Sequence, residues 1–286
     1  RRKCRQDNSS SFARFRFALS LNLALRGIMK ITFLGTGTSQ GVPVIGGDAS
    51  GIDLDNPKNW RTRSSVHVEC GGIHIQIDAG PEFRVQCLKN KIDWIDCFIL
   101  THGHADHIAG MDDLRRFCDR LPNNKLAVYS NDYGLERIRS IFPYALKGKP
   151  TERGYPCFDI KRMPNILEMP GGVKIASTPL PHGPVETLGL VIECGGKKFA
   201  YYTDCKRLTP EALELAKGAD AIALDCLRIS PHPSHMSLSE AINSAMEVGA
   251  RATYFTHLTS HIDYGKLEPK MPHGCHIAYD SLELEI

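Results

Sequence analysis

The stretch that decides the fold is Ile95-Asp-Cys-Phe-Ile-Leu-Thr-His-Gly-His-Ala-Asp-His107. Its first half holds the apolar run Cys97–Leu100, which is typical of a short buried strand. Loops at the carboxyl ends of such strands are where α/β scaffolds present their chemistry. Three imidazoles and a carboxylate are costly to bury without a partner, so we expect a metal site here. Its ligands would be His102, His104, Asp106 and His107.

The spacing of these four side chains indicates two metal ions. His102 and His104 lie two apart on an extended segment, so they point the same way and can share one ion. Asp106 and His107 follow and can bind a second ion. An aspartate is the natural bridge, because its two oxygens can bind cations about 4 Å apart. Imidazole and carboxylate ligands favour zinc, with manganese or iron as alternatives.

Apolar strands elsewhere in the chain also stop at metal-capable side chains. Asp78 could be the N-cap of the following helix, or a carboxylate that holds a ligand histidine. A water between two ions would ionise near neutral pH and become a hydroxide nucleophile, and the ions could clamp a phosphoryl group. The further donors to the two ions would be His182, Asp204 and His257.

Composition indicates an ordinary globular protein. The chain has 286 residues, of which 42% are hydrophobic and 23% charged, and its length fits one or two domains. A net charge of +3 does not argue for nucleic acid, and no window approaches the roughly 18 apolar residues of a membrane span. The ten cysteines include no CxxC pair. This usage is typical of a reduced intracellular protein, so we expect a cytoplasmic location.

Residues 1–28 differ from the rest of the chain. They are rich in arginine and serine, Asp7 is their only acid, and the first methionine is Met29. This composition fits an organelle transit peptide. Because a strand begins at Lys30, we favour a poorly ordered, non-native extension with Met29 as the true start. Residues 29–286 are predicted to form a single hydrolase domain.

The hydrophobic pattern predicts alternating strands and helices. Hairpins are expected across Gly71-Gly72 and Gly195-Gly196. Residues 44–63 are predicted to be an irregular surface loop, and residues 131–165 an insert that rims the active site. The predicted helices span 81–90, 110–120, 133–141, 209–217 and 237–248. The predicted strands span 30–34, 64–70, 73–78, 97–100, 127–130, 173–180, 188–194, 197–203, 219–226, 251–256, 275–279 and 282–286.

A glycine-rich loop, Gly35–Pro43, follows the first strand. Such a loop can cradle an anion with its backbone N–H groups, but this one matches neither GxGxxG nor the P-loop pattern. The alternative is a tight turn whose glycines allow close approach to a metal-binding loop. Both interpretations remain open at this point.

These motifs resemble the metallo-β-lactamase-fold hydrolases over residues 30–286. The resemblance rests on Ile-Asp78-Ala-Gly, Thr-His102-Gly-His-Ala-Asp-His107, His182, Thr-Asp204 and Thr-His257. Within this superfamily the chain is most similar to the phosphoribosyl cyclic phosphodiesterases of phosphonate degradation, the PhnP-like group. That narrower similarity rests on Leu34–Pro43, Pro-Leu-Pro-His182, His235 before a capped helix, and Thr-His257-Leu-Thr-Ser-His261.

The resemblance implies both a fold and a site. The fold would be α/β (α+β), a four-layer αβ/βα sandwich of two mixed sheets flanked by helices, with the metals at one sheet edge. Asp204 would bridge the ions, and Asp78 and His261 would lie behind the ligands. One ion would bind His102, His104 and His182, and the other Asp106, His107 and His257.

The expected substrate class depends largely on His235. A proline-flanked histidine in a loop is usually an exposed residue. His235, however, lies just before a helix with a capping box at Ser237 and Glu240, after a strand expected to end beside the metals. The resemblance implies that it contacts the substrate phosphate or assists the leaving group, which makes it, with Asp106, a catalytic candidate.

The group often carries a cysteine-rich structural zinc site after the Gly-Val-Pro turn. Residues 44–63 contain no cysteine or histidine, so we expect no structural zinc in this loop. The implied substrate is a small or cyclic phosphodiester, cleaved by a metal-bridging hydroxide. We expect no membrane and no nucleic-acid partner, and a homodimer is compatible with the sequence.

Three alternatives stay open. A tRNA 3′-processing endoribonuclease shares the metal ligands, but usually has a long RNA-gripping arm between the residues equivalent to His182 and Asp204, here only 22 residues apart. A thioester or lactone hydrolase of the same fold fits the His235 segment less well. A non-catalytic metal-binding protein is the least favoured, because every ligand position is filled.

Overall fold

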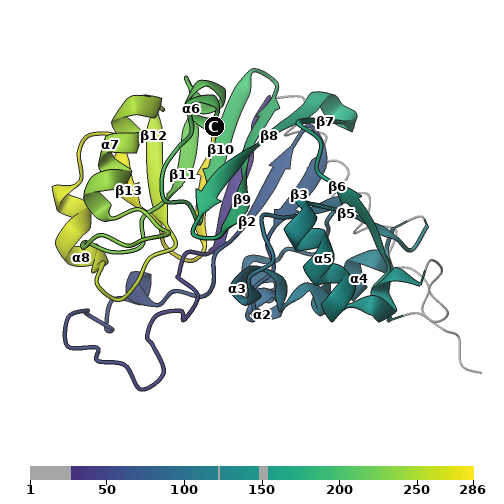
Figure 1. The fold of residues 1–286 in the computed structure, drawn as a ribbon, viewed down its shortest axis with the longest axis horizontal. Helices are drawn as coiled ribbons and strands as arrows, with labels where there is room; N and C mark the ends of the chain where they lie inside the picture. The colour runs from purple at the N-terminus through teal and green to yellow at the C-terminus, as the bar shows by residue number, and fades with distance from the viewer. Residues whose placement is uncertain (1–26, 122, 148–153) are drawn as a thin grey trace, which may run out of the picture.

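Two mixed β-sheets pack face to face, with helices on their outer faces (Figure 1). The computed structural model describes residues 27–121, 123–147 and 154–286. Within these residues each sheet has seven strands. This is the αβ/βα sandwich that the sequence predicted. The prediction of a poorly ordered extension falls on residues that lie, apart from 27 and 28, outside the described part.

The strands are named here in their order across each sheet. The first sheet runs β14 (Leu282–Glu285), β1 (Lys30–Gly35), β2 (Ser65–Cys70), β3 (Ile73–Ile77), β4 (Cys97–Leu100), β5 (Leu126–Ser130) and β6 (Phe158–Arg162). The second sheet runs β13 (Cys275–Ile277), β12 (Ala252–Thr256), β11 (Ala221–Asp225), β10 (Lys197–Tyr202), β9 (Val185–Cys194), β8 (Val173–His182) and β7 (Ile166–Met169).

Helices flank each sheet (Figure 1). Beside the first sheet lie α2 (Phe83–Asn90), α3 (Ala105–Ile108), α4 (Arg115–Cys118) and α5 (Asp132–Ile141). Beside the second lie α6 (Pro210–Ala216), α7 (Leu238–Val248) and α8 (Tyr264–Leu267). The predicted capping box is present at the start of α7, where Ser237 and Glu240 cap each other's backbone N–H groups.

The two sheets share one pairing pattern. Counted from β14 or from β7, the first three strand pairs are antiparallel. The next three pairs, which begin at β3 and at β10, are parallel. Because parallel strands end at the same edge of a sheet, the residues that follow β3, β4, β10, β11 and β12 gather at one edge of each sheet.

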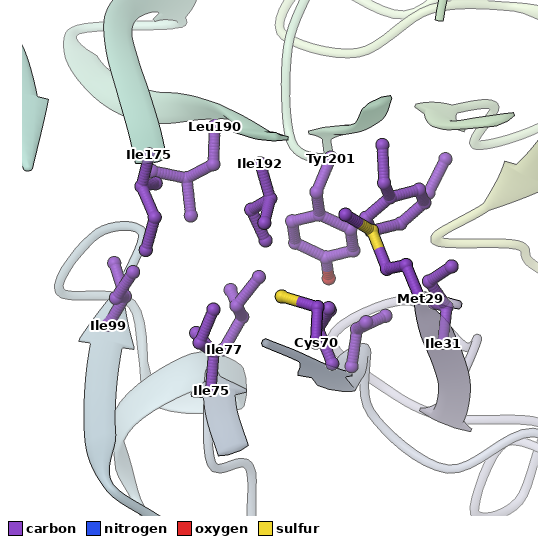
Figure 2. Close-up of a cluster of buried hydrophobic side chains, with 14 of the residues drawn as sticks. Met29, Ile31, Cys70, Ile75, Ile77, Ile99, Ile175, Leu190, Ile192 and Tyr201 are labelled. Atoms are coloured by element: carbon purple, nitrogen blue, oxygen red, sulfur yellow. The ribbon is translucent and has the colours of Figure 1, made fainter. Parts of the chain in front are cut away.

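The core between the sheets comes from strict alternation along the strands. Figure 2 shows Ile75, Ile77 and Ile99 of the first sheet facing the aliphatic side chains of the second. These side chains are fully buried, and each contributes about 1.5–3 kcal/mol by leaving water. Their partners across the interface are Ile175, Leu190, Ile192 and Tyr201.

The helix predicted over 110–120 is present but shorter. It begins as a 3₁₀ turn, Met111–Leu114, that continues directly into α4. A close tertiary approach fixes its start. Gly110 N donates to Ala79 O at 2.8 Å, and a Cβ at Gly110 would lie only 2.0 Å from Gly80 O. The loop after β3 therefore holds this glycine in the N-cap position of the 3₁₀ turn.

The predicted ends of two strands are wrong. β8 continues past Leu180 to His182, and β9 begins at Val185, so the two strands form a hairpin across Gly183-Pro184. Two prolines, Pro179 and Pro181, obscured the strand. They are tolerated because β8 pairs with β7 only as far as Ala176, which leaves the rest of β8 at a sheet edge. The segment 131–165 likewise contains a strand, β6, that the sequence did not indicate.

Asp280, just before β14, ties the loop after β1 to the segment before β2. Its Oδ1 accepts from Thr36 N at 2.9 Å and Thr36 Oγ1 at 2.8 Å. Its Oδ2 accepts from Thr62 N at 2.8 Å and Thr62 Oγ1 at 2.6 Å. One carboxylate thereby satisfies two backbone N–H groups from segments far apart in the sequence.

We predict that Asp280→Ala lowers the free energy of unfolding by about 3 kcal/mol, because the N–H groups of Thr36 and Thr62 lose their acceptor. Urea denaturation of chelator-treated protein measures this change. The control is Asp159→Ala, which removes a half-exposed partner of Lys161 and should change stability by less than about 0.5 kcal/mol. Equal effects of the two substitutions would contradict the assignment.

Candidate metal centre

The predicted ligands converge at one edge of the sandwich, although they come from both sheets. In each group described here, the ligand atoms lie within 4.8 Å of one another. One group follows β4 and ends β8, and consists of His102, His104 and His182. The other follows β4, β10 and β12, and consists of Asp106, His107, Asp204 and His257.

The first group has the spacing of a tetrahedral metal site. His102 Nε2 and His104 Nδ1 lie 2.8 Å apart, and His182 Nε2 lies 3.2 Å from the same His104 nitrogen. Zinc–nitrogen bonds of about 2.0–2.1 Å require nitrogens roughly 3.3 Å apart around a tetrahedron. His102 and His182 are buried, whereas His104 is only partly so. In this group, solvent therefore reaches the ligands most readily at His104.

The second group is built around two carboxylates. Asp106 Oδ2 lies 3.2 Å from His107 Nε2 and 3.4 Å from His257 Nε2. Asp204 Oδ2 lies 3.3 Å from His107 Nε2 and 3.2 Å from His257 Nε2. The same Asp204 oxygen lies 3.8 Å from His102 Nε2 and 3.9 Å from His182 Nε2. Among the described residues, Asp204 is thus the carboxylate with ion-pair distances to both groups.

The residues fit divalent cations. Among the described residues, every ion-pair partner of Asp78, Asp106 and Asp204 is an imidazole. His107 Nε2 is buried and makes no hydrogen bond within the described chain, although two carboxylate oxygens lie beside it. Burial disfavours a charged imidazole, but the surrounding carboxylates raise the pKa of His107 well above its usual range. The cluster requires positive charge, which bound cations would supply.

Asp78 holds the ligand histidine His107, which is one of the two roles expected for it from the sequence. Its Oδ2 is 2.7 Å from His107 Nδ1, and its Oδ1 accepts from Thr101 N at 2.8 Å. The alternative N-cap interpretation is wrong, because α2 begins at Phe83 with Glu82 in the N-cap position. A carboxylate on the far nitrogen fixes the tautomer of a ligand histidine and aims its Nε2 at the metal.

Three of the strand-end residues have an unusual backbone conformation. Asp78, Asp204 and His257 have φ angles of 60°, 51° and 61°. This left-handed region costs a residue other than glycine about 1–2 kcal/mol. Such conformations persist where the surrounding structure holds them, and they cluster at functional sites. Here each one turns the chain sharply at the end of a strand, so that the side chain projects into the cluster.

The glycine-rich loop after β1 supports the turn at His257. Leu258 N donates to Thr36 O at 2.9 Å, and Thr38 N donates to Leu258 O at 3.1 Å. The backbones pack so closely that a Cβ at Gly35 would lie 2.0 Å from Arg63 O. These contacts favour the interpretation of the loop as a close-packed turn beside a metal ligand.

His235 lies against the ligands. Its ring stacks on His257, with centroids 4.8 Å apart and planes 11° apart, and it meets the ring of His182 edge-on at 4.7 Å. A ring nitrogen of His235 also lies within 4.8 Å of the Asp204 carboxylate. The structure therefore places His235 beside both groups of ligands, and not on the open surface.

Asp225 is a functional candidate that the sequence reasoning missed. Its Oδ2 lies 3.0 Å from His235 Nδ1 and accepts from Cys205 N and Met236 N at 3.0 and 3.2 Å. Burial opposes a charged imidazole at His235, but Asp225 raises the pKa of His235 to about 9, with help from Asp204 and Asp106. The sequence does contain a signal for Asp225, because β11 ends at this aspartate just as other strands end at ligands.

His261 is the predicted residue that the structure does not bring into the cluster. It is exposed, and its Nδ1 lies 3.2 Å from Thr259 Oγ1.

Two residues of α5 approach the ligands. The ring of Tyr133 meets that of His104 edge-on at 6.1 Å. The side chain of Arg137 covers Gly103, where a Cβ would lie 2.4 Å from Arg137 Cγ.

None of the described helices combines the length and apolar character needed to cross a membrane.

Comparison with known proteins agrees with this geometry. A family model described as "Beta-lactamase superfamily domain" matches residues 74–258. The crystal structure of a diphosphatase from the PhnP family superposes with a TM-score of 0.81 and 32% identity, over 91% of this chain and 97% of that one. Zn²⁺-bound PqqB from Methylobacterium extorquens shares the fold, with a TM-score of 0.73 and 20% identity over 90% of this chain and all of that one.

A longer relative is also similar. The octanoyltransferase of Porphyromonas gingivalis is 32% identical over 260 residues, which is 89% of this chain but 51% of that protein. The chain therefore spans about half the length of that relative. The family match and the shared architecture confirm the predicted resemblance, and the likeness to a PhnP-family structure agrees with its narrower form. This chain belongs to the metallo-β-lactamase superfamily and has its hydrolase fold.

Proposed function

We propose that this protein is a dinuclear metal-dependent hydrolase that cleaves a phosphoric diester bond in a small or cyclic substrate. The observation that carries the proposal is the position of Asp204, whose Oδ2 lies between two groups of ligand atoms. The likeness to a PhnP-family diphosphatase supports chemistry at a phosphorus–oxygen bond.

In this proposal the strand-end residues hold two divalent ions, zinc being favoured and manganese or iron the alternatives. Bound ions would supply an ionised water as nucleophile and neutralise the phosphoryl oxygens. The protein fixes the ligands from behind. Asp78 orients His107, and the Ser234 carbonyl accepts from His182 Nδ1 at 3.1 Å. The ions would bind His102, His104 and His182 on one side, Asp106, His107 and His257 on the other, and Asp204 between them.

His235 and Asp225 would handle the leaving group. Because Asp225 accepts from His235 Nδ1, the remaining Nε2 is the nitrogen left for substrate. A protonated imidazole beside the ligands can donate a proton to the departing oxygen of a phosphoric ester. Asp225 would act as a positioning residue, since it fixes the ring orientation and favours the charged form.

The alternatives gain less support. The segment between His182 and Asp204 is taken up by β9 and β10, both within the second sheet, so it contains no RNA-gripping arm. A thioester hydrolase would not need the proton donor that His235 and Asp225 provide for a poor alkoxide leaving group, since thiolates leave readily.

Asp204→Ala should lower the hydrolysis rate by at least about 100-fold, since even the loss of an outer partner of a metal ligand costs 10- to 100-fold. We expect the variant to retain its fold by circular dichroism and to hold fewer metal ions by elemental analysis. The dinuclear centre itself should account for two ions per chain. Unchanged activity and metal content in the variant would refute the proposed role of Asp204.

The loss of kcat on substitution of the proton donor, His235, should depend on the leaving group. With bis(p-nitrophenyl) phosphate, whose phenolate leaves without a proton, His235→Asn should change kcat less than about 10-fold. With an alkyl phosphodiester the kcat of the same variant should fall by about 10²-fold or more, because a general acid usually contributes roughly 10²–10⁴ to the rate.

Asp225→Asn should show the same dependence on the leaving group with a smaller amplitude, because it disturbs only the orientation and charge of His235. A merely structural role for either residue would lower both rates equally. The ratio of the two kcat values therefore separates proton donation from misfolding.

The substrate class is tested by turnover of a panel of cyclic and linear phosphodiesters, diphosphates, phosphomonoesters, thioesters and small RNAs. We expect cyclic or small phosphodiesters to be the best substrates, and a chelator to abolish their turnover. Preferential hydrolysis of thioesters or of RNA would replace the proposal with one of its alternatives.

A further inference from the structure

A second cluster of imidazoles lies on the outer face of the first sheet. Val66 and Val68 of β2 and Ile75 of β3 point into the core between the sheets. Alternation therefore sends the residues between them to the opposite face. His74 begins β3 four residues before Asp78, so roughly 13 Å of strand separates the cluster from the metal centre. The cluster consists of His67, Glu69 and His74.

The nitrogens of this cluster have the spacing found in the candidate metal centre. His67 Nε2 and His74 Nδ1 lie 3.2 Å apart, and Glu69 Oε2 lies 3.9 Å from the same His74 nitrogen. The two nitrogen atoms are thus close to the roughly 3.3 Å edge of a tetrahedral zinc site. The ligand atoms of all three residues fall within 4.8 Å of one another.

The hydrogen bonds behind His67 fix its tautomer. Gln76 Nε2 donates to the carbonyl oxygens of Ile77 and Asp78 at 3.1 and 2.9 Å, and to Ser65 Oγ at 2.8 Å. The amide oxygen Oε1 therefore faces His67 Nδ1, 3.2 Å away, and accepts its proton. His67 Nε2 then carries the lone pair and points toward His74. Ligand histidines in proteins have this arrangement, with the far N–H held by an oxygen.

Charge and access also suit a cation. Glu69 is opposite Lys30 in the register of β1 and β2, but the Lys30 ammonium pairs with Glu283 at 2.8 Å. His74 is the ion-pair partner of Glu69 in the described part of the chain. The side chains of His74 and Glu69 are 17% and 20% exposed, so an ion has a path from solvent, while His67 is buried beneath them.

We propose that His67 Nε2, His74 Nδ1 and a Glu69 carboxylate oxygen bind a further divalent ion, zinc, with water in the fourth position. The ligand set is two imidazoles and one carboxylate, which is well suited to zinc. The competing arrangement is a direct hydrogen bond from His74 Nδ1–H to His67 Nε2, without metal. This site is independent of the proposed hydrolytic function, because it shares no ligand with the candidate centre.

The first experiment counts zinc in the full chain after saturation with ZnCl₂ and gel filtration. We expect His74→Ala to hold one ion fewer than the wild type. The matched control is His276→Ala, which removes a half-exposed histidine that pairs with Glu268 at 3.0 Å and belongs to no group of possible metal ligands among the described residues. It should hold the wild-type number. Since the readout is a difference, it does not depend on how many ions the candidate centre binds.

A second variant, Glu69→Gln, tests the site even if His74→Ala fails to fold, because it keeps the size of the side chain and removes its charge. In a competition titration of this variant, we expect the zinc site formed by His67, Glu69 and His74 to lose at least about 10-fold in affinity, as even outer-partner substitutions do. Zinc-soaked crystals should show an anomalous peak between His67 and His74. Wild-type zinc content and affinity in both variants, or no peak there in crystals with zinc in the candidate centre, would overturn the proposal.

Discussion

A buried carboxylate between two sheets is the constraint on which the site depends. Asp204 is 1% exposed, and its Oδ2 has imidazole nitrogens from both sheets within 3.9 Å. A negative charge in such a place must be matched by positive charge from nearby. The surrounding strands therefore have to end close together and in register, and the left-handed turns at Asp78, Asp204 and His257 are part of how they do so.

Two further aspartates support the cluster from outside. Asp78 follows β3 and holds His107, while Asp225 ends β11 and holds His235. Because the sheets share one pairing pattern, Asp78 and Asp204 follow corresponding strands, β3 and β10, and have the same backbone conformation. Asp78 contacts the far nitrogen of a ligand histidine, whereas Asp204 lies among the ligands themselves. Equivalent positions in the two sheets thus have different roles at the site.

Much of the site could be predicted from the sequence, because its signals are local. A short apolar run that stops at His102 or His257 shows both the strand and its chemically active end. Asp225 was missed because Ala-Leu-Asp-Cys continues the apolar run of a buried strand, and the partner that explains it, His235, is ten residues away. The close approach of Gly110 to Gly80, thirty residues earlier, could not be seen at all, since it exists only in the folded chain.

The origin of the ligands in both sheets has a mechanical consequence. Four ligands follow β4 of the first sheet, while His182, Asp204 and His257 belong to the second. Neither sheet alone can complete either group together with the shared carboxylate. Bound ions would therefore act as cross-links between the sheets, a reversible counterpart of a disulfide. Their binding free energy would add to the cohesion of the sandwich, and loss of metal would loosen the edge at which substrate enters.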